Sequence, residues 1–288
     1  PLYEEFTIPV VFHVVVSEEE VLTYGNLSAA RIAETMERLN NIFSGKATRN
    51  AAGVNTGIQF VLAQYNPAGE LMDEPGINRV TVEEVTEGTP PDKYHRFLSQ
   101  NNAIWPHEKY LNIWLMSETK YPKFWNSITK LCVPKYRLGS ETLPGLSLPP
   151  VPSTWVPKVE QIGILFRMST FQYFQRSIDA TAERELVTCI GNYLGLLDTW
   201  KINNSNVNDQ CNDTFAYGIV NNNGSLGTNS SWSKEVGSYR FLSENIMDDP
   251  TGTHRSVSKD QALRMYWVLK NCAGRSMWQS DFALTGKE

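Results

Sequence analysis

Five residues between Thr188 and Asp198 stand at the spacing of a zinc-dependent hydrolytic site. In the motif H-E-x-x-H-x-x-G-x-x-H, two histidines one helical turn apart face the same way, a glycine ends the helix, and a third ligand follows. Aligned on its glycine, this chain fills the ligand, base, ligand, glycine and ligand positions, in order, with Thr188, Cys189, Asn192, Gly195 and Asp198. The spacing is kept, but only Asp198 is a residue type that binds zinc well.

The residue types at these positions do not supply the chemistry that the spacing would serve. Hydrolysis of this kind needs a metal that acidifies water and a carboxylate that takes the proton. Thr188 offers a neutral hydroxyl and Asn192 an amide oxygen, both weak zinc donors, and Cys189 cannot act as the carboxylate base. Glu185 lies three residues before the first-ligand position, roughly 60° away around a helix, so it does not replace the base. We therefore predict no metal site and no catalytic residue here.

The chain has four histidines, and none is an obvious replacement ligand. His13 lies inside an apolar run and is interpreted as a hydrogen-bonded core residue. His95 and His107 lie in polar stretches and are expected at the surface. His254 is the only one near the motif by sequence order, and we interpret it as a loop residue rather than a ligand.

Four cysteines occur, at positions 132, 189, 211 and 272, without any C-x-x-C pair. A zinc knuckle is therefore not expected, and three full disulfide pairings are open. Cys189 lies in an expected helix and is interpreted as a buried thiol. Cys211 and Cys272 could pair in an oxidising compartment. The Asn/Asp cluster from Asn206 to Asp213 could bind calcium through oxygens, but it lacks EF-hand spacing and is interpreted as a solvated loop.

Apolar patterning predicts the elements that must position these residues. Strands are expected in four segments, of which the first is β-branched and buried on both faces: 8–16, 56–63, 110–116 and 162–168, with a short extended piece at 76–80. One amphipathic helix carries an apolar stripe from Ile32 to Phe43, capped by Asn26 or Ser28. A second runs from near Asp179 or Thr181 to about Leu194, where Gly195 suits a left-handed terminus. A last helix follows Ser258, a good N-cap.

Several other segments have weaker patterns. A helix is expected around 91–100, and long ordered loops across 117–160, which hold many of the prolines. Most tryptophans are expected in the core, whereas Trp125 and Trp155 are candidates for an exposed binding surface. Sequons at Asn203, Asn212 and two later asparagines carry little weight in an Asn-rich loop.

Composition excludes several classes of protein. The chain has 288 residues, 41% hydrophobic and 20% charged, which is ordinary for a globular protein. Its net charge is −5 and it contains no basic block, so a nucleic-acid partner is not expected. No apolar run reaches the ~18 residues of a membrane helix. Because the chain starts at Pro1, we expect an N-terminal export segment, with a lipid anchor, to have been removed.

The ordered set of motifs resembles the pappalysin-like branch of the metzincin zinc metalloproteases, over about Ile8 to Leu269. The segments that carry the resemblance are, in chain order, IPVVFHVV, TGIQFVLAQYNPAG, GINRV, KYLNIWLM, NYLGLLDTW, DQCNDTFAY, NIMDDP and DQALRM. Met247 matches the methionine of the family's Met-turn, which lies beneath the metal. Related proteases often carry a tyrosine two residues later, where this chain has Asp249. The chain is most similar to a lipoprotein subset found on bacterial cell envelopes.

The resemblance implies an α+β, metzincin-like (zincin) fold. A twisted mixed sheet of four to five strands is expected, backed by two long helices, with a smaller irregular C-terminal subdomain. The chain would form a single domain, 1–288, with an N-terminal subdomain over 1–195 and a C-terminal subdomain over 196–288. The family's zinc is expected to be absent because its ligands are missing.

Three functional hypotheses follow. The first is a pseudoprotease that has lost zinc and catalysis and binds a peptide or a protein partner in the former active-site cleft. The second is an active zinc-dependent metallopeptidase with unusual ligands, such as Asp198, Asp249 and His254. The third is a cell-envelope scaffold or nutrient-capture lipoprotein. In each case the resemblance implies an exported protein, extracellular or on the bacterial cell envelope.

Overall fold

The protein is described by a computed structural model in which the placed residues are 4–21, 27–49, 51–82, 98, 101–116, 162–167, 181–202, 209–219, 233–236, 239–249, 252–272 and 274–287. The helix expected around 91–100 lies almost entirely outside these residues, as do the loops across 117–160. The same holds for His95, Cys132, Trp125, Trp155, and the sequons other than that at Asn212.

The long strand β1 (Phe6–Ser17) is the centre of a five-stranded sheet. It pairs with β2 (Ile58–Leu62) along its first half and with β3 (Ile77–Val82) along its second half. On its other side it pairs with β4 (Leu111–Met116), which in turn pairs with β5 (Ile164–Arg167). All five expected extended segments are confirmed. Each described pairing is parallel, so a mixture of strand directions is not seen among these strands.

Both faces of β1 are covered, as its β-branched sequence predicts. Within β1 only Thr7 is exposed. Phe12 and Val14 point into the main core with the helices, whereas Val11 and Val15 point into two smaller clusters on the opposite face. The alternation follows from the two-residue period of a strand, which sends neighbouring side chains to opposite faces.

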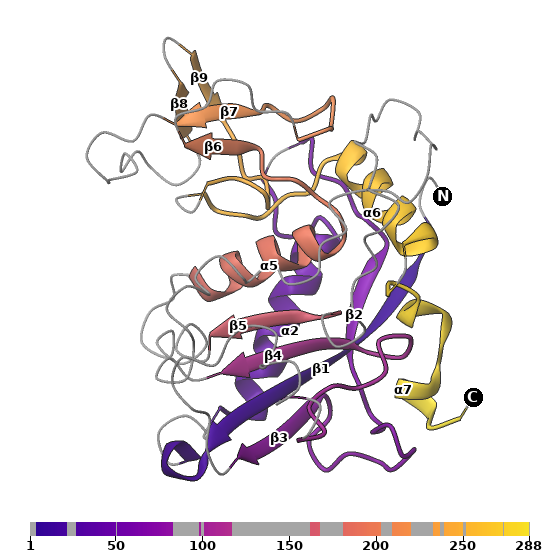
Figure 1. Ribbon diagram of the computed structural model, residues 1–288. Helices are drawn as coiled ribbons and strands as arrows, with labels where there is room; N and C mark the ends of the chain where they lie inside the picture. The colour runs from indigo at the N-terminus through magenta and orange to yellow at the C-terminus, as the bar shows by residue number, and fades with distance from the viewer. Residues whose placement is uncertain are drawn as a thin grey trace, which may run out of the picture.

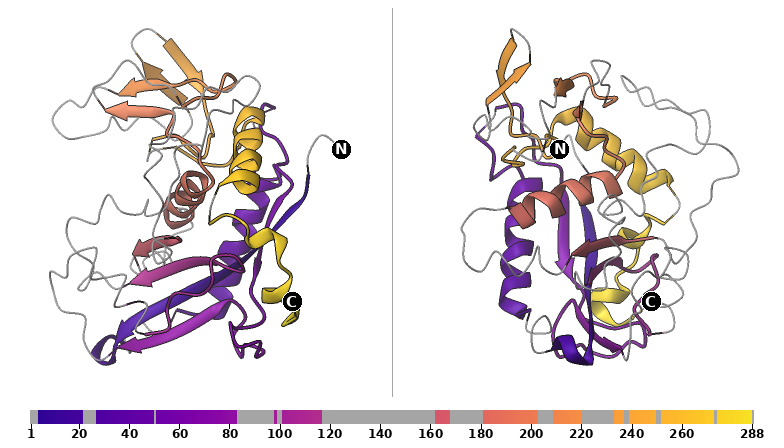
Figure 2. Two further views of the ribbon diagram at one scale, coloured as in Figure 1. Left: turned by 45° about the vertical axis from the view of Figure 1, so that its right-hand side comes forward. Right: turned by 60° about the vertical axis from the view of Figure 1, so that its left-hand side comes forward.

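Two helices, α2 (Ala29–Phe43) and α5 (Thr181–Tyr193), pack on the same core face of the sheet (Figures 1 and 2). The expected stripe on α2 is buried, with Ile32 and Phe43 fully inaccessible. Ser28, one of the two expected caps, accepts a hydrogen bond from the backbone N–H of Arg31. On α5, Leu186 and Ile190 enter the same core. The two long helices of the expected fold are therefore present.

After α5 the chain forms two small sheets before it returns to the main core. Strand β6 (Trp200–Ile202) pairs in parallel with β7 (Tyr217–Ile219), and β8 (Ser233–Val236) forms an antiparallel hairpin with β9 (Tyr239–Leu242). Both lie above α5 in Figure 1. The remaining short elements are η1 (Glu18–Glu20), η5 (Met277–Gln279) and α7 (Phe282–Thr285).

The last long helix, α6 (Lys259–Asn271), packs back on the main core as expected. Its N-terminus forms a capping box between Ser258 and Gln261. The ring of Tyr266 lies 5.2 Å from that of Phe6 at the start of β1. Among the described residues, the helices all lack the combination of length and apolarity needed to cross a membrane.

His13 is a buried, hydrogen-bonded core residue, which confirms its interpretation from the sequence. Its Nε2 lies 2.8 Å from Oδ1 of Asn112, and its Nδ1 accepts a hydrogen bond from Nδ2 of Asn78 at 2.9 Å. Burial lowers the pKa of His13 to about 4. The ring is therefore neutral in the folded protein at neutral pH.

We predict that this histidine makes the fold less stable in mild acid. Between pH 6.5 and about 4 the unfolded chain binds a proton at His13 that the folded chain does not, so stability falls as the pH falls. The loss reaches roughly 3 kcal/mol at pH 4, since each pKa unit corresponds to about 1.4 kcal/mol. Urea unfolding across this range is expected to show a steeper pH dependence for the parent than for His13→Gln. If stability changed equally with pH in the parent and in His13→Gln, the lowered pKa of His13 would be contradicted.

Candidate functional site

Helix α5 ends in a glycine that fixes the direction of the chain toward Asp198. The backbone N–H of Gly195 donates to Asn192 O, and that of Leu196 donates to Gly191 O, which is the Schellman pattern. Gly195 has φ +90, as its terminal position predicts. A Cβ at this residue would come within 2.4 Å of Cγ2 of Val268 on α6. Gly195 therefore serves both the turn and the close approach of two helices.

We predict that Gly195→Ala destabilises the protein by about 2–4 kcal/mol, from left-handed backbone strain and overpacking together. Gly69→Ala is the matched control, because Gly69 has φ +79 but no heavy atom within 3.5 Å of the added Cβ. The control is expected to lose only the backbone part, about 1 kcal/mol. Chemical denaturation of both variants measures the difference. Equal losses of stability in the two variants would show that Val268 moves aside at no energetic cost.

Two buried arginines bind the last carbonyls of α5. Nε of Arg275 donates to Tyr193 O at 2.8 Å, and its guanidinium lies 3.6 Å above the ring of Tyr193. Nε of Arg264 donates to Gly195 O at 2.6 Å. Cations at a helix C-terminus complement its dipole and satisfy carbonyls that have no partner within the helix. Side chains from α6 and from the segment after it therefore stabilise the backbone at the end of α5.

Met247, which the resemblance places in a Met-turn, packs directly against α5. It is fully buried, and a Cβ added to Gly191 would come within 2.7 Å of its sulfur. The turn is fixed by Asn245 and Gln261, whose amides exchange two hydrogen bonds of 2.8 and 2.9 Å, and by the Met247 N–H, which donates to Asn245 Oδ1. Gly191, which weakens α5 by about 1 kcal/mol relative to alanine, therefore makes room for Met247.

The first-ligand position, Thr188, is bound to the Met-turn segment by hydrogen bonds. Its Oγ1 donates to Ile246 O at 2.8 Å and lies 3.2 Å from Nδ1 of His254. Nε2 of His254 lies 2.9 Å from Asp249 O, and because a carbonyl only accepts, this nitrogen carries a proton. His254 is 4% exposed and has φ +51. It is a loop residue, as expected, but one buried against the motif rather than at the surface.

The second and third ligand positions also meet each other. Nδ2 of Asn192 donates to Thr188 O at 3.0 Å and to Oδ1 of Asp198 at 3.4 Å. Asn192 is fully buried, and its Oδ1 has no hydrogen-bond partner among the described residues. The structure therefore brings Thr188, Asn192, Asp198 and His254 together in one polar cluster.

The side chain of Asp249, at the place of the family's tyrosine, is hydrogen-bonded to Tyr217. Its Oδ2 accepts a hydrogen bond of 2.7 Å from the hydroxyl of Tyr217 on β7. The backbone N–H of Asp249 donates to the hydroxyl oxygen of Tyr217. Burial, with the nearby carboxylates of Asp248 and Asp249, raises the pKa of Tyr217. Asp248 is fixed by Thr199, whose hydroxyl also donates to Met247 O. Sequence reasoning missed Tyr217, because nothing local connects positions 217 and 249.

The donor set at the motif positions does not fit zinc. The hydroxyl of Thr188 donates to a carbonyl, and Asn192 turns its amide nitrogen toward Asp198. No three His, Cys, Asp or Glu side chains converge as a metal site within the part of the chain that the structure describes. In the alternative ligand set of Asp198, Asp249 and His254, Oδ2 of Asp249 accepts a hydrogen bond from Tyr217, and Nε2 of His254 donates to Asp249 O. The side chain of Glu185 lies outside the described residues.

The described cysteines are buried thiols. Cys189 is 6% exposed, as interpreted from its place in the helix. Cys211 and Cys272 are both free thiols here, so the disulfide considered between them is not formed. Burial raises the pKa of Cys272 to about 11 and that of Cys211 further. These thiols are poor nucleophiles, since the thiolate is the reactive form.

The remaining sequence candidates have structural roles. Asp209 is buried, and its oxygens accept hydrogen bonds from the Cys211 N–H and the Thr214 hydroxyl. Its carboxylate therefore stabilises the loop in which it lies. His107 is only partly exposed rather than at the surface, beside Glu108. Of the described tryptophans, Trp105, Trp114 and Trp267 are in buried clusters as expected.

Comparison with solved structures identifies the fold. Neither a protein-family model nor a curated protein matches this sequence. Mature mirolysin of Tannerella forsythia, in complex with a cleaved peptide, matches with a TM-score of 0.64 and 22% identity, over 98% of each chain. A promirolysin mutant matches with a TM-score of 0.63 and 20% identity, over 97% of this chain and 85% of that one. The chain therefore has a metzincin-like α+β fold, similar to that of mirolysin.

Proposed function

We propose that this protein is a metallopeptidase-like pseudoprotease that binds a peptide or protein segment in its former active-site cleft and does not cut it. One observation carries the proposal. The side chains at the first two ligand positions, Thr188 and Asn192, hydrogen-bond within the protein, to Ile246 O, His254 and Asp198. A catalytic zinc site instead keeps three donor atoms aimed at the metal and a fourth position open.

The loss of chemistry is supported by the joint change at four positions. Cys189 replaces the general base, and Asp249 replaces the tyrosine and is hydrogen-bonded to Tyr217. The backbone at the end of α5 is fixed by the turn at Gly195, by the packing of Met247 and by two buried arginines. Binding of a peptide is supported by the mirolysin structure of the same fold, which is a complex with a cleaved peptide.

Zinc content and peptidase activity measured on the same purified sample test the loss of catalysis. After incubation with zinc and dialysis, we expect far less than one zinc ion per chain by mass spectrometry. A mixture of random peptides should show no new termini after long incubation. Stoichiometric zinc together with peptide cleavage would overturn the proposal.

Binding is tested separately with a displayed library of random peptides. We expect the parent protein to enrich a defined set of sequences. Asp198→Arg, which places a long cation at the third-ligand position, is expected to abolish that enrichment. Lys201→Glu, at an exposed position on β6, should leave it unchanged. Equal enrichment by Asp198→Arg would place the binding elsewhere.

The rival function is a hydrolase with unusual ligands, and the position of His254 beside Thr188 is the observation in its favour. Any activity found in the parent must then depend on Asp198 and His254. Substituting either by alanine without loss of that activity would remove this rival. The third function is that of an envelope scaffold or nutrient-capture protein. It predicts that the Asp198→Arg variant still pulls down the same partner as the parent protein does.

A further inference from the structure

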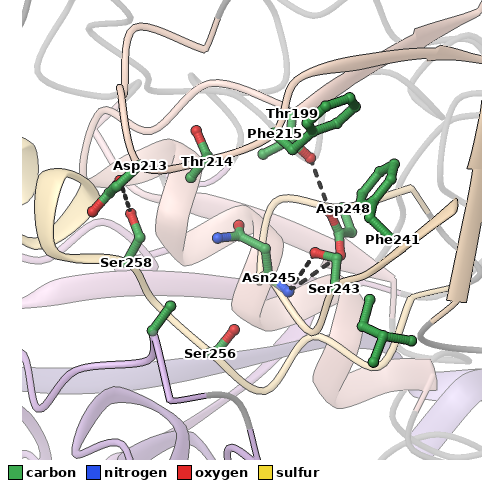
Figure 3. Close-up of a pocket in the computed structure, with 12 residues that line it drawn as sticks. Thr199, Asp213, Thr214, Phe215, Phe241, Ser243, Asn245, Asp248, Ser256 and Ser258 are labelled. Atoms are coloured by element: carbon green, nitrogen blue, oxygen red, sulfur yellow. Dashed lines mark hydrogen bonds between the residues drawn. The ribbon is translucent and has the colours of Figure 1, made fainter. Parts of the chain in front are cut away.

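A cavity of about 290 Å³ lies where the starts of β1 and β2 meet the end of α2 (Figure 1). It shares no lining residue with the cavity beside the Met-turn that Figure 3 shows, and none of the motif positions lines it. Four side-chain amides belong to its wall, those of Asn40, Asn41, Asn55 and Gln59. We call it the amide-lined pocket.

The wall of the pocket at the start of β2 is fixed by its neighbours. Thr56 is fully buried, and both its hydroxyl and its backbone N–H donate to Phe43 O at 2.8 Å. Its carbonyl accepts a hydrogen bond from the hydroxyl of Tyr266 on α6. The next residue, Gly57, has φ +67, and a Cβ on it would collide with Glu4 O, so only glycine fits here. The shape of the pocket is therefore set by the fold before any ligand binds.

The pocket offers neutral hydrogen-bonding groups that the protein itself does not use. Within the described part of the chain, the side chains of Thr7, Asn41 and Gln59 have no hydrogen-bond partner. Thr7 and Gln59 are partners in the register of β1 and β2, so their side chains stand next to each other on one face of the sheet. Asn55 uses its Oδ1 to accept from the Gly57 N–H, which leaves its amide nitrogen as a donor.

These groups select a neutral ligand that both donates and accepts hydrogen bonds. An amide or a hydroxyl does both, whereas a phosphate or carboxylate only accepts and an ammonium only donates, so an ion would leave part of the set unused. The charged side chains in the lining, Glu5 and Lys46, are exposed and opposite in sign, so they give the pocket no net charge. The apolar side chains, Phe6 and Ile58, are buried and offer no face on which an aromatic ligand could stack.

We propose that the amide-lined pocket binds one unit of a neutral saccharide through its ring hydroxyls. Each hydroxyl of a sugar both donates and accepts, and Asn41, Asn55 and Gln59 supply the complementary amide groups. A volume of about 290 Å³ lies at the lower end of the range for small-molecule sites, about 300–1,000 Å³, and suits a single sugar ring. The site is independent of the pseudoprotease proposal, because it uses none of the motif positions.

Saturation-transfer NMR on the full chain tests the ligand class with glucose, galactose, mannose and N-acetylglucosamine. We expect at least one of these sugars to bind, and to bind equally at about 0.02 M and about 0.5 M NaCl, because salt screens charges and leaves a neutral ligand unaffected. Inorganic phosphate and free glycine, an anion and a zwitterion, should bind more weakly than that sugar. Failure of all four sugars to bind, or tighter binding of phosphate or glycine, would overturn the proposal.

Two substitutions that remove an amide at nearly constant size locate the binding. Asn41→Leu and Gln59→Met are each expected to weaken binding of the sugar about threefold or more, because each removes hydrogen bonds to it. Neither side chain is fully buried, so circular dichroism should show the parent fold in both variants. Gln279→Met is the matched control, an exposed glutamine outside the lining, and should bind as the parent does. Parent-like binding by both pocket variants would place the sugar elsewhere and contradict the proposal.

Discussion

A variant that carries Thr188→His, Cys189→Glu and Asn192→His is expected to bind about one zinc ion per chain, because positions i and i+4 of α5 then present two imidazoles on one face. Asp198 supplies the third ligand, a role for which a carboxylate is suited. The backbone needed for this geometry is in place. The Schellman turn at Gly195 leads directly to Asp198, and Met247 packs beneath the helix at Gly191.

The measurement is zinc content by mass spectrometry after dialysis, together with thermal unfolding at increasing zinc. Binding to the folded state alone raises stability by about 2.7 kcal/mol when free zinc is a hundredfold above the Kd. The control carries Cys189→Glu with Thr188→Ala and Asn192→Ala, which restores the carboxylate but no imidazole. It should bind no zinc.

The result separates two explanations for the lack of zinc binding that we expect in the parent protein. Zinc binding by the restored variant, but not by the parent, would show that side-chain identity alone removed the metal. A folded variant that stays free of zinc would show that the backbone geometry has also drifted. In that case the rigid frame assumed for the binding cleft would be contradicted.

Replacing Arg275 by methionine is expected to destabilise the protein by about 3 kcal/mol. The substitution leaves the Tyr193 carbonyl buried without its charged donor, which costs about 1–3 kcal/mol. It also removes the cation from the end of α5 and from the face of the Tyr193 ring. Methionine fills most of the volume, so the loss reports on the polar contacts more than on a cavity.

Arg38→Met is the matched control, because Arg38 is exposed on α2, where it pairs with Glu34 at 2.5 Å. Exposed ion pairs contribute about 0–1 kcal/mol. Urea unfolding of both variants gives the comparison. If the two arginine variants lose the same stability, the contacts of Arg275 do not hold the end of α5.

Much of the fold follows from local patterns in the sequence. The β-branched run at β1, the stripe from Ile32 to Phe43 on α2, and the caps Ser28 and Ser258 each specify an element through neighbouring residues. The bounds differ from those expected by a few residues at most. The parallel pairing of the strands did not follow from the sequence, because strand direction depends on connections between distant segments.

The candidate site was predicted in its positions but not in its contacts. Residues 188 to 198 are close in sequence, so their spacing and the helix period place them together. The hydrogen bond between Thr188 and His254 joins residues 66 positions apart. Tyr217 reaches Asp249 from another strand, and Arg275 reaches Tyr193 from beyond α6. Such pairings depend on how the elements pack.

The sequence by itself determined that residues 188 to 198 have the spacing of a zinc motif without its histidines and glutamate, because residue type and spacing can be read directly from it. Only the tertiary structure decided what the replaced side chains do. Thr188, His254 and Asp249 form a chain of hydrogen bonds because the Met-turn packs against α5 at Gly191, where a side chain would keep the two apart. The pocket lined by Thr199, Asp213 and Phe241 likewise exists only because residues from distant segments meet beside that turn (Figure 3).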